Sequence, residues 1–144
     1  MNKIVLSLFT LATIFVTLQM MVGVEALNIG FAKDVRITMF NNISQTIAIN
    51  CKEKNYDDGF HDVNPGESYS FTIAVLTIVP RSLWYCSFSW GNGGLKTFDI
   101  YLQKRDGKCG MGKTACVWSI REGGPCKVGG QCYQWNNEQN NTLG

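Results

Sequence analysis

The sequence predicts an all-β protein, a small antiparallel β-sandwich of seven or eight strands that is stapled by disulfides. Three observations support this fold class. Apolar and polar residues alternate along most of the chain, turn-forming residues separate the alternating runs, and six cysteines occur among 144 residues. Because the side chains of a strand point alternately to its two faces, each run has one apolar face for a core and one polar face for water.

The N-terminal segment has the composition of a secretory signal peptide. Lys3 supplies a positive charge, residues 4–22 are almost wholly apolar, and a small-x-small pattern ends at Ala26. A retained signal anchor is the alternative, but threonines and a glutamine interrupt the apolar run and no basic cluster follows it. We therefore expect cleavage of residues 1–26, secretion to the extracellular space without membrane insertion, and a single domain over residues 27–144.

The alternating runs predict six strands, at residues 35–40, 46–51, 68–75, 84–90, 97–103 and 116–121. Two shorter segments, 60–63 and 131–135, are expected to add a strand each. Turn chemistry separates the runs, as in Asp57-Asp58-Gly59 and Gly123-Gly124-Pro125. After the signal peptide no segment shows a sustained 3.6-residue apolar repeat, which argues against a helical domain.

The cysteines predict three disulfides in an oxidising compartment. A zinc site is the alternative, but the chain has no CxxC pair and a single histidine. We expect Cys51 to pair with Cys86 across the core, which in the loop-entropy model stabilises the fold by roughly 4 kcal/mol. The pairing of the other four stays open, and one arrangement joins Cys109 to Cys116 and Cys126 to Cys132.

Charge and composition argue against several functions. A formal net charge of +2 is too small to predict binding to nucleic acid or to an anionic membrane. His61 is the only histidine, and paired cysteines leave no thiol, so two-histidine and Cys–His chemistry are both absent. We expect His61 to fix the 57–63 turn by hydrogen bonds. Asp57, Asp58 and Asp62 lack the spacing of a calcium loop. No catalytic residue, metal or cofactor is expected.

The segment 104–113 is the predicted partner-binding loop. It joins two strands with more residues than a hairpin needs, is rich in glycine, and contains a cysteine near its centre. Binding sites favour such loops on a rigid scaffold, although a solvated loop without a partner is the alternative. Its charged residues are Lys104, Arg105, Asp106, Lys108 and Lys113.

Two features concern carbohydrate. The sequons at Asn42 and Asn140 predict N-glycosylation of a secreted chain. The tryptophans could stack on sugar rings, but Trp84, Trp90 and Trp118 share the inward faces of their strands with cysteines, which favours core packing. Trp135 is the tryptophan least constrained by the pattern, and it is the remaining candidate for a sugar contact.

Five short motifs, in order, carry a family resemblance. Residues 50–52 are similar to an HCKS element with Asn in place of His, and residues 57–63 to a DDLGxHxL segment without its Leu. Residues 65–71, 83–90 and 116–120 are similar to PGxxYxF, LFxCxFxW and CxWxI. Between Val35 and Trp135 the chain therefore resembles the plant self-incompatibility S-protein homologue family, with an additional Cys126/Cys132 pair.

This resemblance implies a small secreted β-sandwich that catalyses no reaction. Its founding members act as ligands for a receptor on a cell surface, so it implies an extracellular ligand in pollen–pistil recognition or other signalling. We expect a monomer with an unidentified receptor protein as its partner. Two alternatives come from other classes: a small secreted hydrolase, most obviously a ribonuclease, and an antimicrobial defence protein.

Overall fold

The computed structural model of the chain describes residues 2–28, 32–78, 81–109 and 115–136. The chain divides into two units, Met1–Ala32 and Lys33–Gly144. The first unit contains helix α1 (Lys3–Asn28). Within the described residues, no helix has the length and apolar character of a membrane span. Cleavage of residues 1–26 stays a prediction.

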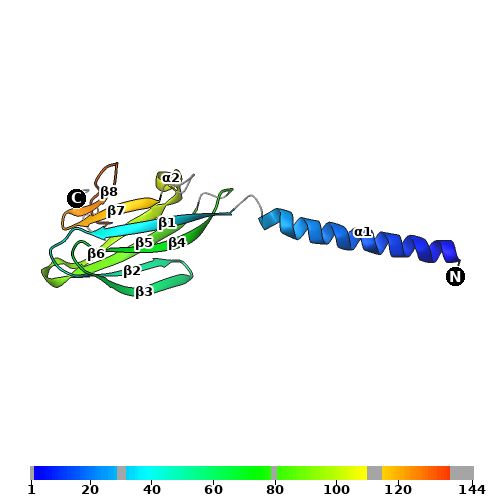
Figure 1. The fold of residues 1–144 in the computed structure, drawn as a ribbon, viewed down its shortest axis with the longest axis horizontal. Helices are drawn as coiled ribbons and strands as arrows, with labels where there is room; N and C mark the ends of the chain where they lie inside the picture. The colour runs from blue at the N-terminus through cyan, green and yellow to red at the C-terminus, as the bar shows by residue number, and fades with distance from the viewer. Residues whose placement is uncertain (1, 29–31, 79–80, 110–114, 137–144) are drawn as a thin grey trace, which may run out of the picture. The chain divides into compact units, whose positions relative to one another are not determined.

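The second unit is a β-sandwich, as the alternating pattern predicts (Figure 1). Two sheets of four strands have the orders β4-β1-β7-β8 and β3-β2-β5-β6. The pairs β2–β3, β2–β5, β5–β6 and β7–β8 are antiparallel, whereas β1 and β7 run parallel. The strands are β1 (Ala32–Asn41), β2 (Ile47–Glu53), β3 (Tyr56–Val63), β4 (Ser68–Leu76), β5 (Leu83–Trp90), β6 (Gly94–Leu102), β7 (Cys116–Arg121) and β8 (Gly124–Lys127). Two short helices, η1 (Gly91–Gly93) and α2 (Gln103–Asp106), precede and follow β6.

The inward faces of both sheets meet in one hydrophobic core. All six strongly patterned segments form strands, and Trp84, Trp90 and Trp118 are buried as expected. The prediction that Trp135 is free for a sugar is wrong. Trp135 is 0% exposed, its ring lies 5.3 Å from that of Phe88, and its Nε1 donates to the Glu122 carbonyl at 2.9 Å. The chain around Trp135 lies against the core, which the local pattern does not reveal.

Two segments differ from the prediction. The expected turn at 57–59 lies inside β3, whose preceding turn is at residues 54–55. The expected strand at 131–135 makes only an isolated bridge, from Cys132 to Cys126. The expected turn at 123–125 overlaps the start of β8, and the turn itself lies at residues 122–123. Gly124 (φ +134°) allows this close packing, because a Cβ there would lie 2.0 Å from the Tyr133 carbonyl oxygen.

The three disulfides join Cys51 to Cys86, Cys109 to Cys116 and Cys126 to Cys132. The predicted Cys51–Cys86 pairing is confirmed, but its expected position across the core is wrong. The two cysteines are directly opposed on β2 and β5, which are neighbours in one sheet, with their Cα atoms 4.0 Å apart. Both point inward, so the disulfide reinforces one sheet instead of linking two.

Candidate functional site

The predicted partner-binding loop has a structural centre at Asp106. Its side chain is 0% exposed, and its carboxylate accepts hydrogen bonds from Arg105 Nη2 at 2.7 Å and Lys127 Nζ at 2.6 Å. Burial by itself would raise the pKa of Asp106, but these hydrogen bonds hold the pKa below its ordinary value. The prediction that Asp106 contacts a partner is therefore wrong.

Arg105 also has a structural role. Its guanidinium carbon lies 5.0 Å from the ring centroids of Phe98, Trp118 and Tyr133, and its Nη2 donates to the Asp99 carbonyl at 2.6 Å. Phe98 belongs to one sheet and Trp118 to the other, so this cation joins the two sheets between β6 and β7. Of the other predicted loop residues, Lys104 and Lys108 are exposed, and Lys113 lies outside the described residues.

A second polar cluster lies at the opposite edge of the sandwich, where β3 faces β4. The His61 and Tyr69 rings stack at 4.0 Å, and His61 Nε2 lies 3.0 Å from the Tyr69 hydroxyl and 3.0 Å from the Asp58 carbonyl oxygen. The Tyr69 hydroxyl donates to the Asp58 carboxylate. Burial and this carboxylate raise the pKa of Tyr69, so the phenol stays protonated and joins the two sheets.

The acidic residues of this region are used locally. Asp57 pairs with Lys52 at 2.7 Å on the surface, and this hydrogen bond lowers the pKa of Asp57 and raises that of Lys52. Asp62 is exposed. Over the described ranges, no three His, Cys, Asp or Glu side chains gather in a way that could hold a metal ion.

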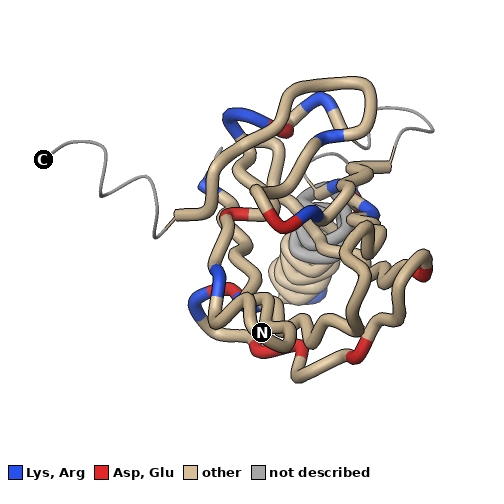
Figure 2. The backbone as a smooth tube through the Cα atoms, turned by 90° about the vertical axis from the view of Figure 1, so that its left-hand side faces the viewer, with Lys and Arg blue, Asp and Glu red and all other residues tan. Residues whose placement is uncertain are grey.

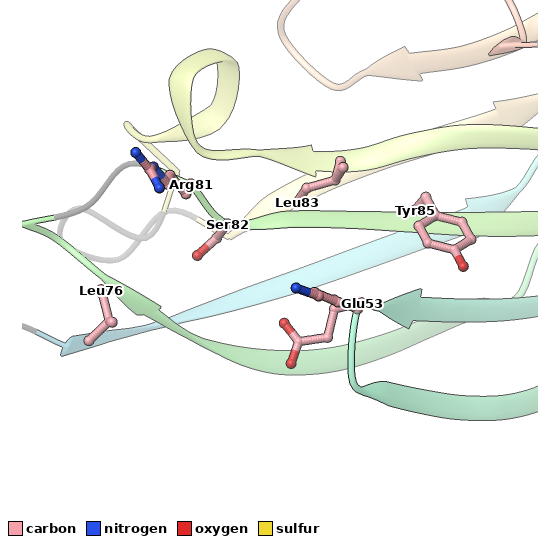
Figure 3. A pocket seen from close by; sticks show the side chains of 7 residues that line it. Glu53, Leu76, Arg81, Ser82, Leu83 and Tyr85 are labelled. Atoms are coloured by element: carbon pink, nitrogen blue, oxygen red, sulfur yellow. The ribbon is translucent and has the colours of Figure 1, made fainter.

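A hollow that could hold a partner lies at the end of the sandwich where β2 and β4 finish and β5 begins (Figure 3). Its volume is about 530 Å³, within the range of ligand-binding clefts. Leu83 and Tyr85 project from β5, and Glu53 lies opposite them at the end of β2 (Figure 3). The lining residues are Glu53, Lys54, Leu76, Arg81, Ser82, Leu83 and Tyr85.

A second hollow of about 270 Å³ adjoins the first. The two share Arg81, Ser82 and Leu83, and the second is completed by residues 102–105 of β6 and α2. We call the two hollows together the end groove. The segment singled out by its sequence therefore contributes the start of α2 to one wall, and most of the groove comes from segments that the sequence did not single out.

Gln103 holds that wall in place. Its Nε2 donates to the Leu76 carbonyl at 2.7 Å, its Oε1 accepts from the Ser82 amide at 3.2 Å, and its own amide donates to the Ser82 carbonyl at 3.1 Å. One side chain thus fixes both ends of the connection between β4 and β5. The sequence signal for this role is weak, because a glutamine at the end of a strand usually faces water.

Charge around the end groove is unbalanced. Lys54, Arg81 and Lys104 are exposed and form no ion pair within the part of the chain that the structure describes. Glu53 is the one carboxylate in the lining. Elsewhere basic and acidic positions are both spread along the backbone (Figure 2), in keeping with the small net charge. The groove is therefore a locally cationic surface on a nearly neutral protein.

The predicted glycosylation site at Asn42 lies in the turn after β1. Its side chain is exposed, its Nδ2 donates to the Ser119 hydroxyl, and its backbone amide donates to the Ile120 carbonyl at 2.9 Å. Asn140 lies outside the described residues. Glycosylation at both positions stays a prediction.

The geometry described so far defines a small, disulfide-linked β-sandwich with a groove between loops at one end. The family model described as plant self-incompatibility protein S1 matches residues 36–142. The chain belongs to this family, and the resemblance carried by its motifs is confirmed.

Relatives and a solved structure agree with this assignment. The chain is 36% identical to S-protein homolog 19 of Arabidopsis thaliana, with coverage of 74% of this chain and 80% of that protein. It is 40% identical to S-protein homolog 2 of the same plant, over 63% of this chain and 60% of that protein. A solved self-incompatibility protein homologue, described as one of a widespread family of small, highly stable, secreted plant proteins, matches with a TM-score of 0.51 and 19% identity. The match covers 74% of this chain and 96% of that one, and it shows the same fold.

Proposed function

We propose that this protein is a secreted, non-catalytic recognition protein, an extracellular ligand for a cell-surface receptor in signalling or pollen–pistil recognition. The observation that carries the proposal is the contrast between two kinds of polar group. Three cations of the end groove, Lys54, Arg81 and Lys104, are exposed and without ion-pair partners among the described residues. By contrast, Asp106, Arg105 and Tyr69 are paired inside the fold. Unpaired charge beside exposed apolar side chains is typical of a surface that meets a partner.

The candidate groups for catalysis support the same proposal. All six cysteines lie in disulfides, so no thiolate nucleophile is present. His61 Nε2 is directed at Tyr69 and Asp58, the groups that hold β3 to β4, and among the residues that the structure describes no serine or cysteine bonds to it. These contacts give the histidine a structural role.

The proposal is tested with fluorescently labelled protein on intact plant cells. We expect saturable binding that excess unlabelled protein displaces and that protease treatment of the cells removes. Protein that has been reduced and alkylated is the control and is expected not to bind. Binding that neither saturates nor responds to the protease would contradict the receptor-ligand proposal.

The hydrolase alternative has its own measurement. The purified protein and its His61→Ala variant are incubated with RNA, and we expect no cleavage from either. Cleavage that disappears in the variant would assign a ribonuclease instead. Inhibition of microbial growth at micromolar concentration would likewise favour the defence alternative, for which the groove offers few cations.

A further inference from the structure

We propose that the end groove binds an extended acidic peptide segment with apolar side chains, as on an exposed loop of an extracellular protein. This inference rests on the proposed function, because it names the chemistry that a partner must present. It goes beyond family membership, since it depends on side chains that line a particular groove of this chain.

The floor of the groove is apolar and accessible. Leu76, Leu83 and Tyr85 are 57%, 43% and 39% exposed, and Leu102 continues the apolar lining into the second hollow. In Figure 3, Leu83 and Tyr85 follow one another along β5, and Leu76 lies at the end of β4, which belongs to the other sheet. Because these side chains sit in a hollow, a partner's apolar side chain can cover them from several sides.

The rim of the groove is cationic. Lys54 lies in the β2–β3 turn, Arg81 at the entrance to β5 and Lys104 in α2, so three separate segments bring their cations to one place. Arg105 also lines the groove, but its guanidinium is paired with the Asp106 carboxylate. With Glu53 as the opposing charge, the rim favours a partner that carries carboxylates on both sides of its apolar residues.

The same lining disfavours single-stranded nucleic acid. A nucleic-acid strand needs a row of cations for its phosphates and aromatic faces for its bases. Here aliphatic side chains separate the cations, and Tyr85 is the one aromatic residue in the two hollows. An extended peptide directs successive side chains to opposite sides. A sequence that alternates apolar and charged residues therefore fits an apolar floor with a charged rim.

The groove is also held in shape before a partner arrives. The hydrogen bonds of Gln103 to Leu76 and Ser82 tie the β4–β5 connection to α2. The Cys109–Cys116 disulfide and the bond from Lys33 Nζ to the Gly107 carbonyl, at 2.7 Å, hold residues 107–109, directly after α2. Preformed walls reduce the entropy lost on binding, which favours a short linear segment as the partner.

The experiment selects binders from a library of short random peptides displayed on phage. The bait is the secreted protein, and a second bait carries Lys54→Glu and Arg81→Glu, two changes at exposed positions. We expect peptides selected on the first bait to be enriched in Asp and Glu next to Leu, Phe or Tyr. The most enriched peptide, measured by fluorescence anisotropy, should bind the double variant at least about tenfold more weakly, and less tightly at high salt.

Arg36→Glu is the control, because Arg36 is exposed on β1 and does not line the end groove. It should change the affinity by less than about twofold. A selection without acidic–apolar enrichment, or equal binding to the double variant, would overturn the inference. If the double variant still binds plant cells normally, the groove inference fails and the receptor-ligand proposal stands. If the peptide binds as expected and the protein does not bind cells, the groove inference stands and the receptor-ligand proposal fails.

Discussion

Asp106 and Lys127 lie 21 positions apart in the chain, and the carboxylate Oδ1 of the first lies 2.6 Å from the Nζ of the second. With Arg105 on the other carboxylate oxygen, the pair ties α2 to the end of β8. The two cations also lie over the Trp118 ring, at 5.0 and 5.7 Å. The charges of the predicted loop thus stabilise the edge of the sandwich.

Removing the Asp106 charge is expected to destabilise the protein. Asp106→Asn leaves Arg105 and Lys127 without their counter-ion in a largely buried place, so we expect the free energy of unfolding to fall by about 3–5 kcal/mol. Urea denaturation followed by tryptophan fluorescence measures the change. Asp34→Asn, at an exposed position of β1, is the control and should cost less than about 0.5 kcal/mol. Equal losses in the two variants would contradict the role of this cluster.

The same carboxylate predicts a loss of stability in acid. The pKa of Asp106 in the fold lies below its ordinary value of 3.8, so its contribution is fully present above that value. As the pH falls through the pKa of the folded state, protonation removes the charge and the contribution disappears. Thermal unfolding between about pH 6 and pH 2 should show this decline in the native protein, and Asp106→Asn should flatten it. An unchanged pH profile in the variant would assign the acid sensitivity to other groups.

Replacing Trp135, near the end of the described chain, is expected to destabilise the protein strongly. Trp135→Ala removes a fully buried side chain that packs against Phe88 and Trp90, so we expect a loss of about 3–5 kcal/mol. Val128→Ala, at a position that is 61% exposed, is the control with little expected effect. A Trp135→Ala variant as stable as the native protein would return this tryptophan to the candidates for a sugar contact.

Replacing Gln103 is expected to loosen the wall of the end groove locally, at the Ser82 amide. In Gln103→Ala the Ser82 amide loses its acceptor, so its hydrogen exchange should become at least about tenfold faster. Gln103→Glu retains an acceptor for Ser82 and loses the donor to Leu76, so it should leave the Ser82 amide more protected than the alanine variant does. Equal exchange in all three proteins, measured by mass spectrometry or NMR, would show that Gln103 does not hold the connection.

Replacing the side-chain amide of Asn41 by a carboxylate is expected to weaken the turn after β1. Its buried Nδ2 donates to the carbonyls of Gln45 and Val63 at 2.8 and 2.9 Å, and Asn41→Asp replaces this donor with an acceptor. We expect a loss of about 1–3 kcal/mol for each carbonyl left unpaired. Asn92→Asp, at an exposed position in η1, is the control. A similar small loss in both variants would contradict the structural role of the Asn41 amide.

Much of the fold could be predicted because a half-buried strand shows a local alternation of apolar and polar residues. The alternation in β1, β5 and β7 places their apolar side chains on one face wherever the strands lie in the sheet. The motifs of the family are equally local, so the sequence alone is enough to recognise them. The pairing of Cys51 with Cys86 also followed, since both occupy apolar faces.

The end groove could not be predicted in the same way. Its lining comes from the β2–β3 turn, the entrance to β5 and the start of α2, three segments that lie close together only in the folded chain. Lys104 and Arg105 are neighbours in sequence with the same sign of charge, yet one faces solvent and the other is held over three aromatic rings. Sequence composition cannot separate the two.

The sequence by itself therefore determined the all-β class, the six strongly patterned strands, the inward cysteines and the family. The tertiary structure alone decided that Cys51 and Cys86 are neighbours in one sheet, that Trp135 lies in the core, and that Asp106 is a structural ion. The physical reason is the range of the interactions. Side-chain alternation repeats every two residues, whereas burial and ion pairing depend on groups brought together from distant positions.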